Sequence, residues 1–174
     1  MLLNLSDVLR PSGKVINEEI EINLESFNGS FGEYKVLSAE KLVLSCENLD
    51  EGRAKVSGHT VMTFEASCDR CLKEMEITVQ IDFERTCSAP DYVSDDEEDE
   101  SHDFMEGYQL DTDALLYNEI TVNWPVKIVC RDDCKGLCLV CGHNLNEGDC
   151  GCDTFVPDPR MAALKDIFET TKEV

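Results

Sequence analysis

Residues 76–84 read Glu-Ile-Thr-Val-Gln-Ile-Asp-Phe-Glu, with polar and apolar side chains alternating through the whole segment. In a β-strand successive side chains point to opposite faces, so this segment predicts a strand with one buried and one exposed face. Residues 16–24, 42–44 and 53–65 are further predicted strands, because they alternate in the same way or are rich in apolar and β-branched residues. Short turns between these segments favour an antiparallel sheet, either open or barrel-like.

Two helices are predicted later in the chain. The segment 110–124 carries Asp111 and Asp113 at its start, where acidic groups complement the helix dipole, and Pro125 closes it. Asp158-Pro159-Arg160 then places an N-cap residue before a proline at the first helical position. Apolar residues at helical spacing follow and predict a C-terminal helix packed on the body of the protein. The fold class predicted from these elements is α+β with few helices.

The composition describes an acidic globular chain. Its 174 residues suffice for one or two domains. Fifteen basic residues against 37 acidic ones give a formal net charge of −22, which excludes proteins that coat bulk nucleic acid or bind anionic membranes. The start of the chain lacks the features of a secretory signal, and no apolar run is long enough to span a bilayer. We therefore expect a soluble cytoplasmic protein with no membrane partner.

An acidic segment divides the chain. Residues 89–107 contain six consecutive acids from Asp95 to Glu100 and almost no apolar side chains. Such a segment cannot form a core, so we expect a flexible loop that is either solvated or in contact with a basic partner. The predicted regions are a β-rich domain at 1–88 with a Cys-x-x-Cys hairpin, the loop at 89–107, and a third region at 108–174. That third region holds a helix, a cysteine-rich zinc module and the C-terminal helix.

Ten cysteines are the most informative part of the composition. Disulfides are rare in a reducing compartment, so clustered cysteines there are more often metal ligands or redox groups. Residues 138–142 read Cys-Leu-Val-Cys-Gly, a tight turn that can present two thiolates to one metal ion, and the turn-forming residues 144–148 bring the chain back. The sequence therefore predicts a four-thiolate zinc site, the C-terminal cluster, formed by Cys138, Cys141, Cys150 and Cys152.

A second Cys-x-x-Cys pair, Cys68 and Cys71, lies between two predicted strands. A thioredoxin-type dithiol begins a helix, whereas a pair in a hairpin favours half of a zinc site. Cys46 and Cys87 are isolated in sequence, and we expect them in the core. Of the ten cysteines, four remain once these two and the C-terminal cluster are set aside. They predict a second zinc site, the hairpin cluster, formed by Cys68, Cys71, Cys130 and Cys134. A surviving thiol pair, a disulfide, or an exchange of partners between the clusters are the alternatives.

Both predicted sites are structural rather than catalytic. Four thiolates fill the shell of a tetrahedral zinc ion, whereas a catalytic zinc keeps an open position for water or substrate. Several of the few basic residues lie near the cysteines and can either contact RNA or an acidic surface, or balance the charge of the thiolates. These residues are Arg70, Lys73, Lys127, Arg131 and Lys135.

A series of motifs resembles the YceD family, the large ribosomal RNA subunit accumulation proteins. The resemblance spans nearly the whole chain, and Leu139 departs from it where the Cys-Pro-x-Cys knuckle of the family has proline. In chain order the motifs are Cys68-Asp69-Arg70-Cys71-Leu72, Cys130, Asp133-Cys134-Lys135-Gly136-Leu137-Cys138, Cys141-Gly142, Leu145-Asn146, Cys150-Gly151-Cys152 and Asp158-Pro159-Arg160.

The resemblance implies a bacterial or plastid ribosome-biogenesis factor with no catalytic activity. Its partner would be a ribosomal protein or the precursor of large-subunit ribosomal RNA. Not all members keep the cysteines, which implies that zinc holds this version together and is not the shared activity. The competing hypotheses are a thiol oxidoreductase that uses Cys68 and Cys71, a zinc-dependent RNA-processing enzyme, and a zinc-ribbon transcription regulator.

Overall fold

The computed structural model describes residues 1–10, 14–29, 32–50, 52–92 and 104–152. The chain forms two compact units. The first consists of Met1–Ser67 and Glu74–Ile128, and the second of Cys68–Lys73 and Val129–Val174. The chain therefore enters the second unit twice, once through a loop between two strands and again after the helix. The division at 1–88, 89–107 and 108–174 stays a prediction.

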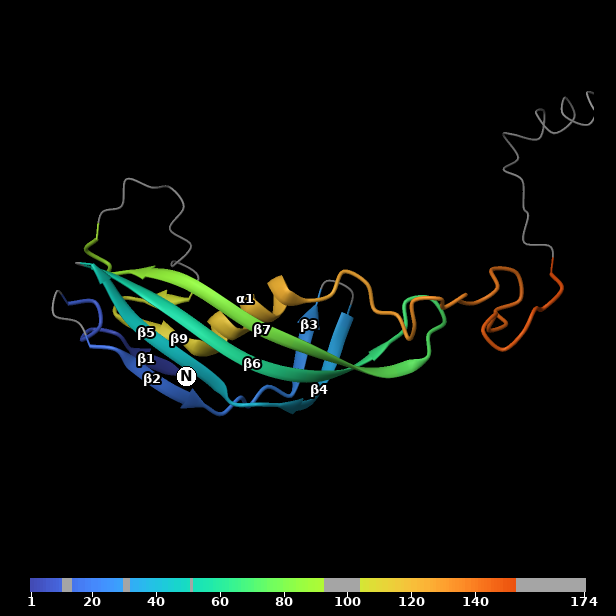
Figure 1. Ribbon diagram of the computed structural model, residues 1–174, viewed down its shortest axis with the longest axis horizontal. Coiled ribbons are helices and arrows are strands. Elements are labelled where there is room, and N and C mark those ends of the chain that lie inside the picture. Colours follow the sequence, from blue (N-terminus) through green and yellow to red (C-terminus); the bar gives the residue numbers. More distant parts are fainter. Residues whose placement is uncertain (11–13, 30–31, 51, 93–103, 153–174) are drawn as a thin grey trace, which may run out of the picture. The chain divides into compact units, whose positions relative to one another are not determined.

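An antiparallel sheet forms most of the first unit (Figure 1). Its central strand β6 (Arg53–Ser67) pairs along its full length with β7 (Glu74–Ser88). The other edge of β6 pairs first with β5 (Leu42–Asp50) and then with β4 (Gly32–Ala39). Strands β2 (Ile16–Ile20) and β3 (Ser26–Gly29) extend these two branches. The pairings of the described strands form an open sheet, so the antiparallel prediction is confirmed and closure into a barrel is not observed.

The burial of β7 follows the alternation on which the prediction was based. Exposed and buried or half-buried residues alternate from Glu74 to Cys87, and the strand is longer at both ends than the predicted segment 76–84. Predicted strands 42–44 and 53–65 also lengthen, whereas 16–24 ends earlier, at Ile20. Strands β3 and β4 were not predicted, because their polar side chains and partial exposure hide the alternation.

A helix and a small sheet complete the described part of the first unit. Strands β1 (Leu2–Asn4), β9 (Gln109–Asp111) and β8 (Met105–Glu106) pair in that order. Helix α1 (Thr112–Asn123) lies within the predicted segment 110–124, whose first two residues belong to β9. The Asp111 side chain caps the helix by accepting hydrogen bonds from the amides of Asp113 and Ala114. Among the described residues, no helix is long and apolar enough to cross a membrane. The central acidic residues 93–103 and the predicted C-terminal helix lie outside the described residues.

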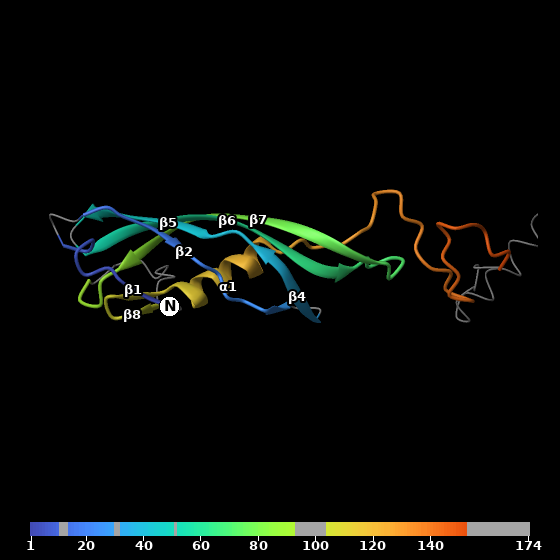
Figure 2. The same cartoon turned by 90° about the horizontal axis from the view of Figure 1, so that it is seen from below.

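The core of the first unit lies between the sheet and α1 (Figure 2). Phe27, Phe64 and Trp124 pack in tilted and edge-to-face contacts with ring centroids 4.9 to 6.2 Å apart. Cys46 and Cys87 are fully buried, as predicted. Glu119 of α1 is also buried and accepts a 2.7 Å hydrogen bond from Arg85, which neutralises its charge. The first unit therefore has a hydrophobic core of its own.

Gly58 of β6 makes room for two large side chains of that core. Leu44, Gly58 and Phe83 lie in one row across β5, β6 and β7. A Cβ atom at position 58 would overlap the Phe83 ring, with Phe83 Cε1 only 2.6 Å away. The absent side chain therefore allows both neighbours to pack over the strand.

We expect Gly58→Ala to destabilise the protein by about 1–3 kcal/mol, because the added methyl group overpacks the core. Urea unfolding measures the change. Ser57→Ala, on the opposite face of the same strand, should change stability by less than about 0.5 kcal/mol. Phe83→Leu should cost less in the Gly58→Ala background than in the native chain. Equal costs in the two backgrounds would contradict the steric explanation.

Candidate metal centres

The hairpin cluster brings four cysteine sulfurs together within the second unit. The Sγ atoms of Cys68, Cys71, Cys130 and Cys134 all lie within 4.8 Å of one another. Cys68 Sγ is 3.9 Å from Cys134 Sγ, and Cys71 Sγ is 3.7 Å from Cys130 Sγ. Four sulfurs about 2.3 Å from a tetrahedral zinc ion are separated by about 3.8 Å, so this spacing fits such an ion.

The loop 68–73 presents two of these sulfurs. Its ends are joined by a hydrogen bond from the Cys68 amide to the Lys73 carbonyl, and Leu72 turns the chain with a left-handed φ of 57°. The Arg70 guanidinium donates to the carbonyls of Asp132 and Cys134, at 3.2 and 2.7 Å. Arg70 thus ties the loop to the later segment that supplies the other two sulfurs.

Gly136 allows the later segment to approach this loop closely. Its φ is 78°, and a Cβ atom there would lie 3.0 Å from the Arg70 carbonyl oxygen. The same oxygen accepts a 3.1 Å hydrogen bond from the Leu137 amide. Glycine is the residue that fits both the left-handed backbone and the close approach.

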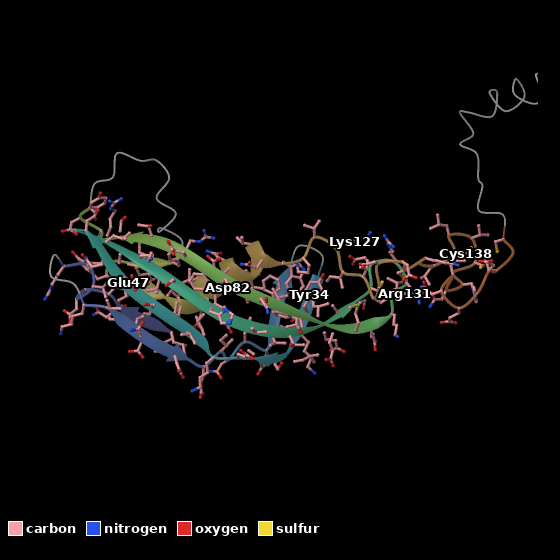
Figure 3. The ribbon with its side chains drawn as sticks, viewed as in Figure 1. Tyr34, Glu47, Asp82, Lys127, Arg131 and Cys138 are labelled. Atoms are coloured by element: carbon pink, nitrogen blue, oxygen red, sulfur yellow. The ribbon has the colours of Figure 1, made fainter. Side chains whose placement is uncertain are left out.

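The C-terminal cluster joins Cys138, Cys141, Cys150 and Cys152, whose sulfurs also lie within 4.8 Å of one another. The Cys138 amide donates to the His143 carbonyl, and the Gly142 amide donates back to the Cys138 carbonyl, both at 2.8 Å. Cys138, labelled in Figure 3, is buried, whereas Cys141 is exposed. This cluster is therefore the more accessible of the two.

Each cluster contains one cysteine whose thiol pKa is lowered by hydrogen bonds from backbone amides. Burial raises the pKa of the Cys68 thiol, but hydrogen bonds from backbone amides, that of Cys130 first, outweigh burial and lower the pKa to about 6. The amides of Cys141 and Val140 lower the pKa of Cys138 to about 6. Amides aimed at sulfur favour the charged form, which is the form that binds a metal ion.

Other thiols of the clusters retain their protons. Burial, followed by hydrogen bonds with neighbouring thiols, raises the pKa of Cys130 to about 12. Hydrogen bonds with Cys141 and Cys150 raise the pKa of Cys152 to about 12. A metal ion that enters either cluster must therefore displace protons, and its affinity falls as the pH is lowered.

The structure thus groups the cysteines into the two sets that the sequence predicted, and both sets could hold a metal ion. All ten cysteines are free thiols, so no disulfide joins Cys68 to Cys71. Four sulfurs complete a tetrahedral shell in each cluster, an arrangement typical of structural metal sites. That zinc occupies them stays a prediction.

The basic residues near the cysteines play a part that the sequence did not show. Arg70 bonds two backbone carbonyls, and Arg131 forms an ion pair with Asp133 and donates to the Asn146 side chain. Both arginines therefore join segments of the second unit. Lys127 lies in the first unit, whereas Lys73 and Lys135 lie in the second.

Sequence reasoning treated Asn146 only as part of a turn. In the structure its side-chain nitrogen donates to Cys134 Sγ at 3.3 Å. This bond and the Gly136 amide offset the effect of burial and lower the pKa of Cys134. Leu145-Asn146 is one of the motifs on which the family resemblance rests, and this signal could have identified Asn146.

Comparisons with known proteins identify one family. A family model described as large ribosomal RNA subunit accumulation protein YceD matches residues 56–168, which include all eight clustered cysteines. Uncharacterized proteins of Mycobacterium bovis and Mycobacterium tuberculosis are each 30% identical over 129 residues, covering 73% of this chain. The matched part spans 61% of the length of these relatives.

A plant protein and the solved structures complete the comparison. The chloroplastic large ribosomal RNA subunit accumulation protein YCED homolog 1 of Arabidopsis thaliana is 28% identical over 78 residues. That alignment covers 45% of this chain and 24% of the plant protein. No solved structure gives a significant match.

The geometry predicts two metal ions per chain. Cys71→Ser should remove one ion and Cys141→Ser the other, because each change leaves a cluster with three thiolates. Elemental analysis gives the stoichiometry, and cobalt substitution gives the sulfur-to-metal charge-transfer absorption. Cys46→Ala, outside both clusters, serves as the control and should retain two ions. A single ion shared by all eight cysteines would contradict this arrangement.

Proposed function

Because the chain belongs to the YceD family, we propose that it is a non-enzymatic, cytoplasmic ribosome-biogenesis factor that supports accumulation of large-subunit ribosomal RNA. The observation that carries this proposal is the family match over residues 56–168. The match covers part of both units and the two cysteine clusters. The Arabidopsis relative, whose name refers to the same process, supports it further.

In this function zinc would be a structural ion in both clusters. Among the described residues of the second unit, the buried hydrophobic side chains are four cysteines: Cys68, Cys71, Cys134 and Cys138. The aliphatic side chains of Leu72, Leu139 and Val140 are exposed. Metal–thiolate bonds would therefore replace a carbon core, contributing on the order of 10 kcal/mol to folding.

The proposed partner is a basic ribosomal protein. With a formal net charge of −22, the chain repels exposed RNA phosphates but attracts a strongly basic polypeptide. Glu74, Glu76, Asp82 and Glu84 lie on the exposed face of β7, where they would add to this attraction. Shielding a basic protein before it joins the precursor of large-subunit RNA would link this partner to RNA accumulation.

Depletion of the protein should lower the ratio of mature large-subunit to small-subunit ribosomal RNA. Complementation with the native chain should restore the ratio, whereas Cys138→Ser should restore it incompletely, because the altered C-terminal cluster has only three thiolates. The two RNAs are quantified from total RNA, and immunoblotting confirms equal protein levels. An unchanged ratio after depletion would remove the proposal and make a thiol oxidoreductase the better hypothesis.

Binding to basic large-subunit proteins should weaken steeply as salt is raised, because opposite charges account for most of the attraction. Co-precipitation of the full chain with purified large-subunit proteins, repeated across a salt series, measures this dependence. Reversing Glu76 and Asp82 to lysine should weaken binding more than reversing the exposed Glu25 and Glu40. A complex that is insensitive to salt would contradict the electrostatic partner proposal.

A further inference from the structure

Asn146 lies between the two halves of the C-terminal cluster in sequence, but its side chain reaches the hairpin cluster. Its Nδ2 donates to Cys134 Sγ at 3.3 Å and to Asn144 Oδ1 at 2.9 Å. Its Oδ1 accepts from the Lys135 amide at 2.8 Å and from the Arg131 guanidinium at 2.9 Å. These bonds fix the orientation of the amide, with the nitrogen toward sulfur.

The loop that carries Asn146 begins and ends in the C-terminal cluster. Cys141 precedes the loop and Cys150 follows it, so a metal ion bound to both closes the segment between them. The Leu145 amide donates to the Gly136 carbonyl at 3.0 Å, and a β-bridge pairs Leu137 with Asn144. The loop is therefore held against the segment that contains Cys134.

We infer that Asn146 couples the two clusters, so that a metal ion in the C-terminal cluster raises the affinity of the hairpin cluster for its own ion. This inference rests on the metal binding proposed above. It assigns Asn146 as a positioning residue for Cys134, not as a ligand.

The physical basis is a shared ordering cost. A donor held against a thiolate stabilises its charge and orients the ligand, and removal of such an outer partner typically costs roughly 10–100-fold in metal affinity. Closing the 141–150 loop with a metal ion restricts the chain that positions Asn146, so the hairpin cluster then gains its donor at a lower entropic cost. Linkage makes the effect reciprocal, because each ion must favour binding of the other by the same factor.

Two substitutions separate the donor from the scaffold. Asn146→Asp keeps an oxygen for the Lys135 amide and for Arg131 but replaces the nitrogen that faces Cys134, whereas Asn146→Ala removes every contact. Zinc titration of the full chain against a chelating dye should show a loss of roughly 10–100-fold in affinity at one site in both variants. Native mass spectrometry should then show accumulation of the chain with one zinc ion.

His143→Ala is the matched control. His143 lies in the same loop, and the described hydrogen bond at this residue uses only its backbone carbonyl. This variant should load two ions like the native chain. If Asn146→Asp also behaved like the native chain, Asn146 would only shape the loop, and the inference would be wrong.

A double-mutant cycle tests the coupling itself. Replacing Cys141 and Cys152 together by serine disables the C-terminal cluster and should weaken zinc binding at the hairpin cluster. The same replacement in the Asn146→Asp background should add little further loss, because the connection is already broken. Additive losses would overturn the coupling. A native chain that bound no zinc would instead reject the metal proposal on which the inference rests.

Discussion

The described part of the second unit buries sulfur where other domains bury carbon. Its buried hydrophobic side chains are all cysteines, and three of its aliphatic side chains face solvent. Eight closely spaced thiols do not attract one another as a hydrocarbon core does, and their charged forms repel. The arrangement therefore depends on groups that stabilise the sulfur atoms. These are the hydrogen-bond donors, namely backbone amides and the Asn146 side chain, and the metal ions that both clusters could hold.

The fold of the first unit positions part of the hairpin cluster. The first unit has its own core and pairs β6 with β7 over 15 residues, so the loop at 68–73 follows from the register of that hairpin. The partner cysteines come 59 and 66 residues later in the chain, after α1. The hairpin cluster therefore needs both segments of the second unit, 68–73 and the segment after α1. Pairing of β6 with β7 turns the chain at 68–73 and so brings Cys68 and Cys71 together.

Much of this arrangement could be predicted from the sequence, but not all of it. Strict alternation identified β7, and the acids at the start of α1 identified that helix. Spacing and counting predicted the same two groups of four cysteines whose sulfurs the structure brings together, because a tight Cys-x-x-Cys turn has few alternatives. Strands β3 and β4 were missed because their sequences carry no clear alternation of apolar and polar residues. Asn146 was missed because a side chain that contacts sulfur resembles ordinary turn chemistry.

The charge of the outer strand β7 also bears on pairing between two copies of the protein. Among the described strands, β7 pairs only with β6, so its other edge is a long template on which a second copy could add a strand. An antiparallel copy of β7 would place Glu74 and Glu76 against Asp82 and Glu84, and like charges directly opposite each other destabilise a strand pair. The acidity of this strand thus disfavours edge-to-edge pairing of two copies through β7, independently of any partner that the charge attracts.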